Sequence, residues 1–145
     1  EEYMVEGDSI LYAAAKYVVF GEALPSENRD VFVNQVAWAG WIGLLLTGLN
    51  LIPAGQLDGG HIIATLLGRQ AQRLYWPLVA LVIALSLIST IWWLLAVLVL
   101  LFGRFYATPL DAVTPLDQRR RRIAYFALTM FVLVFVPLPL QIVAP

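Results

Sequence analysis

The sequence predicts an all-α fold, that of a polytopic helical membrane protein in which the transmembrane helix carrying the central motif is broken. Of the 145 residues, 61% are hydrophobic and only 13% are charged, whereas an ordinary soluble domain has roughly 25% charged residues. Apolar runs of membrane-helix length recur along the chain, and Pro53 and Gly55 interrupt the first of them. The absence of cysteine excludes disulfides, thiol chemistry and Cys-based metal sites.

Residues 1–35 are predicted to form a connecting or interfacial segment. They open with the acidic stretch EEYMVEGDSI and carry no initiator Met, which does not resemble a secretory signal. Residues 11–20 can form a short helix at the bilayer surface, and GEALPSENRD then reads as a loop. We therefore expect the chain to be part of a longer one.

Residues 36–69 are predicted to form a broken helix. The stretch from Val36 to Ile52 is uncharged and mostly apolar, and it is nearly long enough to span a bilayer. After the break at Pro53, a second, short helix is expected from near Asp58 to Arg69. Non-helical backbone at membrane depth is tolerated only where protein or a wet cavity satisfies its amides, so the break indicates a site.

Residues 76–102 allow two interpretations. One helix of these 27 residues would be about 40 Å long, which fits a bilayer core of about 30 Å only with tilt. The aromatic pair Trp92 and Trp93 favours the interface instead, which argues for a short hairpin turning near Ser89. The length of the run favours one span. The charge distribution favours two, because a hairpin would place the flanking basic residues on one side of the membrane. Residues 123–140 are predicted to be the last span, ended by the prolines of VPLPL.

Charge is distributed unevenly along the chain. Seven of the ten acidic residues lie in residues 1–30, and seven of the nine basic residues follow Asp58. The run Arg119 to Arg122 directly precedes an apolar segment and is predicted to mark a cytoplasmic loop that contacts lipid phosphates. Since no aromatic residues interleave with these arginines, we expect a lipid bilayer as partner and no nucleic acid.

Asp58 is the single carboxylate between residues 31 and 68. A charged residue at membrane depth costs at least about 2.5 kcal/mol, so an intramembrane Asp is a functional candidate. The alternative is that Asp58 caps a helix beginning at Gly59. Asn50, Pro53 and the adjacent Gly59 and Gly60 shift the balance toward function, because glycines let another backbone or an ion approach the carboxylate.

Small residues form a stripe upstream of this break. Ala39, Gly43 and Thr47 recur every four residues and Asn50 follows three later, so all four face one way on a helix. Such a stripe permits close helix contact. The stripe by itself fits ordinary helix packing, whereas Asn50 would point an amide toward the same partner helix.

The stretch NLIPAGQLDGGH resembles the second motif of the site-2 proteases, which are intramembrane zinc metalloproteases with the pattern Asn-x-x-Pro followed by Leu-Asp-Gly. Asn50, Pro53, Leu57, Asp58 and Gly59 match that pattern in place. Weaker resemblance to the same family extends to three other parts of the chain: GDSILY, TPLDQRRRR and the last segment, which ends in prolines. The resemblance implies that Asp58 is the third ligand of Zn²⁺, whereas in this family the two histidine ligands and the general-base glutamate come from a His-Glu-x-x-His helix on an earlier span.

That earlier motif is absent from this chain, which has one histidine. A catalytic zinc needs three protein ligands and a water, so we expect the 145 residues to be the C-terminal half of a protease and to be inactive alone. The partner expected from the resemblance is an N-terminal half bearing His-Glu-x-x-His. His61 shares a helix face with Asp58 and is either a second ligand or a hydrogen-bonding group near the metal.

The complete enzyme, by resemblance, would hydrolyse peptide bonds within or near transmembrane segments of membrane proteins. Asn50 would then hold a substrate carbonyl or stabilise the oxyanion, or else form an interhelical hydrogen bond. We expect a multi-pass protein of a prokaryotic plasma membrane. The rival interpretation is a non-catalytic membrane module, either a pseudoprotease or a transporter fragment whose Asp58 binds an ion or proton.

Overall fold

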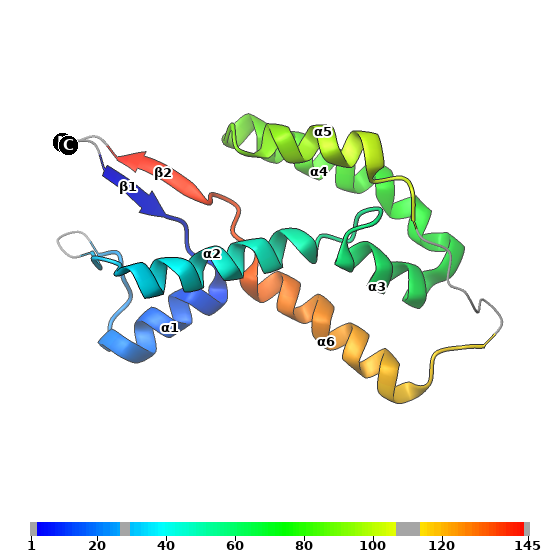
Figure 1. Cartoon of the computed structure of the whole chain (residues 1–145), viewed down its shortest axis with the longest axis horizontal. Coiled ribbons are helices and arrows are strands. Elements are labelled where there is room, and N and C mark those ends of the chain that lie inside the picture. The colour runs from blue at the N-terminus through cyan, green and yellow to red at the C-terminus, as the bar shows by residue number, and fades with distance from the viewer. Residues whose placement is uncertain (1–2, 27–29, 107–113, 144–145) are drawn as a thin grey trace. The chain divides into compact units, whose positions relative to one another are not determined.

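A computed structural model describes residues 3–26, 30–106 and 114–143, and its chain is mostly helical (Figure 1). The elements in chain order are β1 (Tyr3–Glu6), α1 (Ile10–Phe20), α2 (Gln35–Asn50), α3 (Asp58–Leu67), the 3₁₀ helix η1 (Gly68–Leu74), α4 (Tyr75–Ile88), α5 (Trp92–Phe102), α6 (Gln118–Val134) and β2 (Leu140–Val143). The chain divides into two compact units, residues 1–49 with 132–145 and residues 50–131.

A two-stranded antiparallel sheet joins the ends of the chain in the first unit, so the all-α prediction is wrong in this respect. Strand β1 pairs with β2, with Tyr3 opposite Val143 and Glu6 opposite Leu140 (Figure 1). The Gly7 amide extends the contact by donating to the Pro139 carbonyl oxygen at 2.8 Å. Each strand has four residues, too few for a clear alternating pattern, and the pairing is between distant segments that no local pattern predicts.

Helix α1 begins after Ser9, whose side chain accepts a hydrogen bond from the Tyr12 amide at 3.1 Å. This is an ordinary N-cap. Lys16 is buried in the middle of the helix, and its ammonium group lies 2.7 and 2.9 Å from the two carboxylate oxygens of Asp8. A buried charge needs such a partner, so the GDS stretch has a structural role in this unit.

Helix α2 packs through one face within the first unit. Trp41 is buried and its indole N–H donates to the Gly7 carbonyl oxygen at 2.8 Å. Seven residues later, about two helical turns along, Gly48 lies so close to α6 that an added Cβ would be 3.2 Å from the Val134 carbonyl oxygen. At 100° per residue, Trp41 and Gly48 share one side of the helix, which fixes the face of α2 that is covered.

The second unit is built on α3 and η1. Ile63, Ala64 and Ala71 form a buried cluster, against which Leu74, Tyr106 and Leu128 pack. Helix α3 ends at Leu67, and its C-cap residue Gly68 has a φ of +57°, which only glycine adopts readily. The bend there separates α3 from the following helices.

Residues 75–102 form two helices, α4 and α5, which lie side by side with a turn at Ser89 and Thr90 (Figure 1). Of the two interpretations, the structure therefore has the hairpin. The Tyr75 hydroxyl donates to the Leu100 carbonyl oxygen at 3.1 Å and ties the open ends together. Trp92 is buried whereas Trp93 is exposed, so the two tryptophans lie in different environments, and the interface location of the pair stays a prediction.

One helical run among the described residues is long and apolar enough to cross a membrane by length and composition, namely Asp58–Ile88 with 31 residues. This run contains Gly68 and the 3₁₀ segment, so it consists of α3, η1 and α4 and is not one straight helix. Helices α1 and α5 are apolar but shorter.

Helix α6 differs at both ends from the predicted span 123–140. It begins at Gln118 because Asp117 caps it, accepting a hydrogen bond from the Arg120 amide at 3.0 Å. The arginine run Arg119 to Arg122 therefore forms its first turn, where a loop was predicted. The helix ends at Val134, before the prolines 137 and 139, since residues preceding proline disfavour helical backbone.

Candidate functional site

The central motif forms a compact loop between α2 and α3. Helix α2 ends at Asn50 and α3 begins at Asp58. Between them, Ile52 and Ala54 are buried, and the loop closes on itself through hydrogen bonds from the Ala54 amide to the Ile52 carbonyl oxygen at 2.7 Å and from the Leu57 amide to the Ala54 carbonyl oxygen at 3.0 Å. Pro53 lacks an amide hydrogen and cannot continue a helix, which places the break where the sequence predicted it.

Gly59 and Gly60 permit the first turn of α3 to lie directly on the backbone of this loop. A Cβ at Gly59 would overlap the Leu51 carbonyl oxygen and lie 2.6 Å from that of Ile52. A Cβ at Gly60 would overlap the Gly55 carbonyl oxygen and lie 2.7 Å from that of Ala54. The two glycines are therefore needed for backbone contact, and this contact sets the position of Asp58 at the helix start.

The other side of the loop rests on the end of α5. Gly55 has a φ of +51°, and a Cβ there would be 2.5 Å from the Phe102 carbonyl oxygen. The Tyr106 hydroxyl donates to the Pro53 carbonyl oxygen at 3.0 Å. Burial raises the pKa of the Tyr106 phenol, and a hydrogen bond with the Gly55 backbone opposes that shift. The phenol therefore remains a protonated donor at neutral pH.

We expect Tyr106→Phe to loosen the motif loop without unfolding the protein. The substitution removes one hydrogen bond to Pro53, which contributes about 1 kcal/mol, and keeps the ring in its half-buried place. Hydrogen exchange of the amides of residues 51–57 should become roughly fivefold faster. Tyr125→Phe is the control, because Tyr125 is exposed on α6; equal exchange in both variants would show that Tyr106 does not hold the loop.

Asp58 is the first residue of α3, and its side chain is exposed. The capping residue is Leu57, and no side-chain hydrogen bond caps the helix. The alternative in which Asp58 caps a helix starting at Gly59 is therefore wrong. An acidic group in the first turn is favoured by the helix dipole. Within the described part of the chain, the carboxylate makes no hydrogen bond or ion pair, so it is available to a ligand.

His61 lies one turn further along α3, also exposed, and its amide donates to the Leu57 carbonyl oxygen at 3.0 Å. Asn50, at the end of α2, is exposed as well. Among the described residues no group of three His, Asp or Glu side chains could hold a metal ion. Asp58 thus fits one position of a zinc site, and these residues do not complete the tetrahedral set that zinc requires.

The small-residue stripe lies on the side of α2 opposite to its packed face. Ala39, Gly43 and Thr47 are exposed, and among the described residues nothing lies within 4 Å of a Cβ added at Gly43. The Thr47 hydroxyl donates to the Gly43 carbonyl oxygen at 2.7 Å, so it is satisfied within its own helix. Whether a partner covers this face stays a prediction.

Sequence reasoning missed two contributions to the site. Tyr106 is 53 residues from Pro53, and no local pattern connects the two. The contact of Gly55 with the end of α5 was missed for the same reason, although the glycine itself was a signal, since a glycine between two helices indicates a positive φ or a close backbone approach.

Comparison with known proteins finds relatives that are named as probable zinc metalloproteases and one uncharacterised protein. The Arabidopsis thaliana protein named "Probable zinc metalloprotease EGY2, chloroplastic" is 34% identical over 135 residues, which is 91% of this chain and 24% of the relative. "Probable zinc metalloprotease EGY3, chloroplastic" from Oryza sativa subsp. indica is 36% identical over 108 residues, 69% of this chain and 18% of the relative. An uncharacterised protein of Methanocaldococcus jannaschii is 42% identical over 38 residues, 26% of this chain and 10% of that protein.

This chain therefore spans less than a quarter of the length of the relatives it matches. No solved structure matches it. The profile of Peptidase family M50 matches residues 17–90, about half of the chain, and this range includes α2, the motif loop and Asp58. The chain belongs to Peptidase family M50, the site-2 protease family of zinc metalloproteases.

Proposed function

We propose that this chain forms the C-terminal part of an intramembrane zinc metalloprotease that hydrolyses peptide bonds within or near transmembrane segments of membrane proteins. The observation that carries the proposal is the free, exposed carboxylate of Asp58 at the start of α3, held by backbone contacts of the motif loop. Membership of Peptidase family M50 supports the reaction class.

Asp58 would be one zinc ligand, and the two remaining ligands and the general base would come from a His-Glu-x-x-His helix outside these 145 residues. The chain contains one histidine, and the relatives named zinc metalloproteases extend well beyond the matched region. Zinc, when bound, would polarise the scissile carbonyl and acidify a water. Asn50 would hold a substrate carbonyl or steady the developing oxyanion.

The exposed side of α2 would receive that missing helix. The stripe of Ala39, Gly43 and Thr47 is open in this chain, and small residues permit close approach of two helices. Asn50 follows on the same side of α2. Packing of the His-Glu-x-x-His helix against this side would therefore bring its ligands toward the residues that this chain contributes to the catalytic site.

The polytopic membrane arrangement is also part of this proposal. Besides the run Asp58–Ile88, several helices expose large apolar side chains: Val18, Leu87, Leu94 and Phe126 are each more than 60% exposed. Exposed apolar side chains also follow one another directly at Val18 to Phe20 and at Leu100 to Phe102. Contiguous apolar surface is rare on water-soluble proteins, and lipid contact would remove it from water. We propose a prokaryotic plasma membrane as the location, although the plant relatives are named chloroplastic.

The test compares the full-length gene product with the isolated 145-residue chain in the same detergent. The full-length protein should cleave a single-span membrane substrate, lose the activity with a zinc chelator and regain it with added zinc. The isolated chain should show no cleavage and at most weak zinc binding. Stoichiometric sub-micromolar zinc in the isolated chain, lost in His61→Ala, would mean that Asp58 and His61 form a separate site and would favour the ion-binding module.

A further inference from the structure

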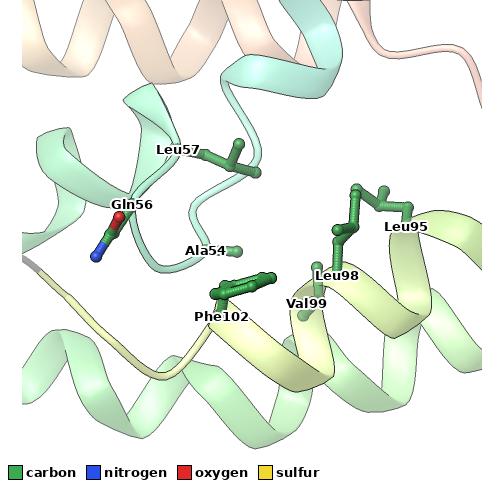
Figure 2. A pocket seen from close by; sticks show the side chains of 8 residues that line it. Ala54, Gln56, Leu57, Leu95, Leu98, Val99 and Phe102 are labelled. Atoms are coloured by element: carbon green, nitrogen blue, oxygen red, sulfur yellow. The ribbon is translucent and has the colours of Figure 1, made fainter.

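An apolar cavity of about 210 Å³ lies against the motif loop in the second unit. Its lining comes from the loop on one side and from α5 on the other, as Figure 2 shows. The residues that line it are Ala54, Gln56, Leu57, Leu95, Leu98, Val99, Phe102 and Gly103. Gln56 is the one polar side chain among these eight, so the cavity suits a hydrocarbon group.

The walls of this cavity are fixed by contacts described above. Gly55 touches the backbone of Phe102 at the end of α5, and the Tyr106 hydroxyl holds Pro53. Ala54 and Val99 are almost fully buried. The cavity is therefore a feature of two mutually supported segments and not of one mobile side chain.

The size of the cavity matches one large apolar side chain. A dry apolar cavity of about 150 Å³ accommodates a benzene-sized group, so 210 Å³ suffices for leucine or phenylalanine. Leu57 lines the cavity and is the residue directly before Asp58. One residue of extended chain covers about 3.3 Å, so the cavity is within one or two residues of a peptide bond held beside Asp58.

We propose that this cavity is a specificity subsite, which receives the apolar side chain one or two positions from the scissile bond of a membrane substrate. The inference rests on the proposed function, because it places the scissile bond near Asp58. Hydrolysis needs water at that bond, so the neighbouring substrate residues lose their contact with lipid. An apolar side chain there gains by leaving water for contact with the apolar walls of the cavity.

The test measures cleavage preference in the full-length protein. Substrates carry Ala, Leu or Phe at each of the two positions on either side of the cleaved bond. The wild type should prefer Leu or Phe over Ala at one of these positions by at least about tenfold in kcat/KM, since a single methylene in an apolar pocket already gives roughly 10 to 200-fold.

Leu98→Trp should fill the cavity and reduce that preference to less than about twofold, because kcat/KM falls more for the Leu and Phe substrates than for the Ala substrate when the larger side chain no longer fits. Leu100→Trp is the matched control: Leu98 and Leu100 are both on α5 and both 44% exposed, but only Leu98 lines the cavity. Phe102→Ala provides a second variant. It should widen the cavity and shift the preference from Leu toward Phe.

An unchanged preference in Leu98→Trp and Phe102→Ala would overturn the proposal. An equal loss of kcat/KM for every substrate would also overturn it, because it would indicate that a lipid chain or another part of the protein occupies the cavity. Failure of the proposed function is distinguishable. In that case the wild type cleaves none of the substrates, or cleavage continues in Asp58→Ala with the zinc content unchanged.

Discussion

Asp58→Ala in the full-length protein is expected to abolish cleavage of a membrane substrate and to lower bound zinc, while expression and membrane insertion persist. Asp58 is exposed and unpaired within the described residues, so its removal leaves no buried partner unsatisfied and should cost little stability. Mutating an outer partner of a metal ligand already costs about 10 to 100-fold in affinity or activity. Removal of a ligand itself should therefore reduce cleavage by more than about 100-fold.

Asp30→Ala is the control for this variant. Asp30 is also an exposed aspartate, but it lies outside the motif and accepts a hydrogen bond from the next amide. It should keep cleavage and zinc. Undiminished proteolysis by purified Asp58→Ala would contradict the ligand assignment.

Gly59→Ala should cause the second largest loss of cleavage activity, although it changes no metal ligand. The added methyl group would overlap the Leu51 carbonyl oxygen, so α3 and the loop must separate. Overpacking of this kind costs about 1 to 3 kcal/mol, and a catalytic ligand set tolerates only about 0.5 Å of misplacement. We expect cleavage to fall at least about tenfold and zinc content to fall with it, measured on the purified full-length protein.

Gly40→Ala is a matched control for this substitution. Gly40 is inside α2, and nothing in the described chain lies within 4 Å of an added Cβ. Alanine there should stabilise the helix by up to about 1 kcal/mol and preserve zinc and cleavage. If Gly59→Ala behaves like Gly40→Ala, the contact between α3 and the loop does not determine where Asp58 lies.

The sequence predicted the parts of the fold that depend on local signals. Pro53 and Gly55 indicated the break between α2 and α3, because proline removes a donor and glycine permits the positive φ found there. The apolar run after η1 indicated helix, and the turn at Ser89 was one of two interpretations. The motif itself indicated the family.

The remaining features depend on contacts that the pattern of apolar residues does not encode. Strands β1 and β2 pair from opposite ends of the chain, and the early start of α6 depends on the cap at Asp117. Gly59 and Gly60 were expected to admit a backbone or an ion beside Asp58, and the structure shows that the backbone of the loop occupies that space. The strand pairing and the glycine contacts carry no periodic signal and could be identified only with the fold, whereas Asp117 is a local capping residue that the prediction did not use.

The most direct test of the central claim is a structure of the zinc-loaded, full-length protein, with the metal located by anomalous scattering at the zinc edge. We expect one zinc ion whose distance to a carboxylate oxygen of Asp58 is about 2.0 to 2.2 Å, with two histidines from the His-Glu-x-x-His helix as the other protein ligands. A catalytic zinc with a full set of protein ligands that does not include Asp58 would contradict it.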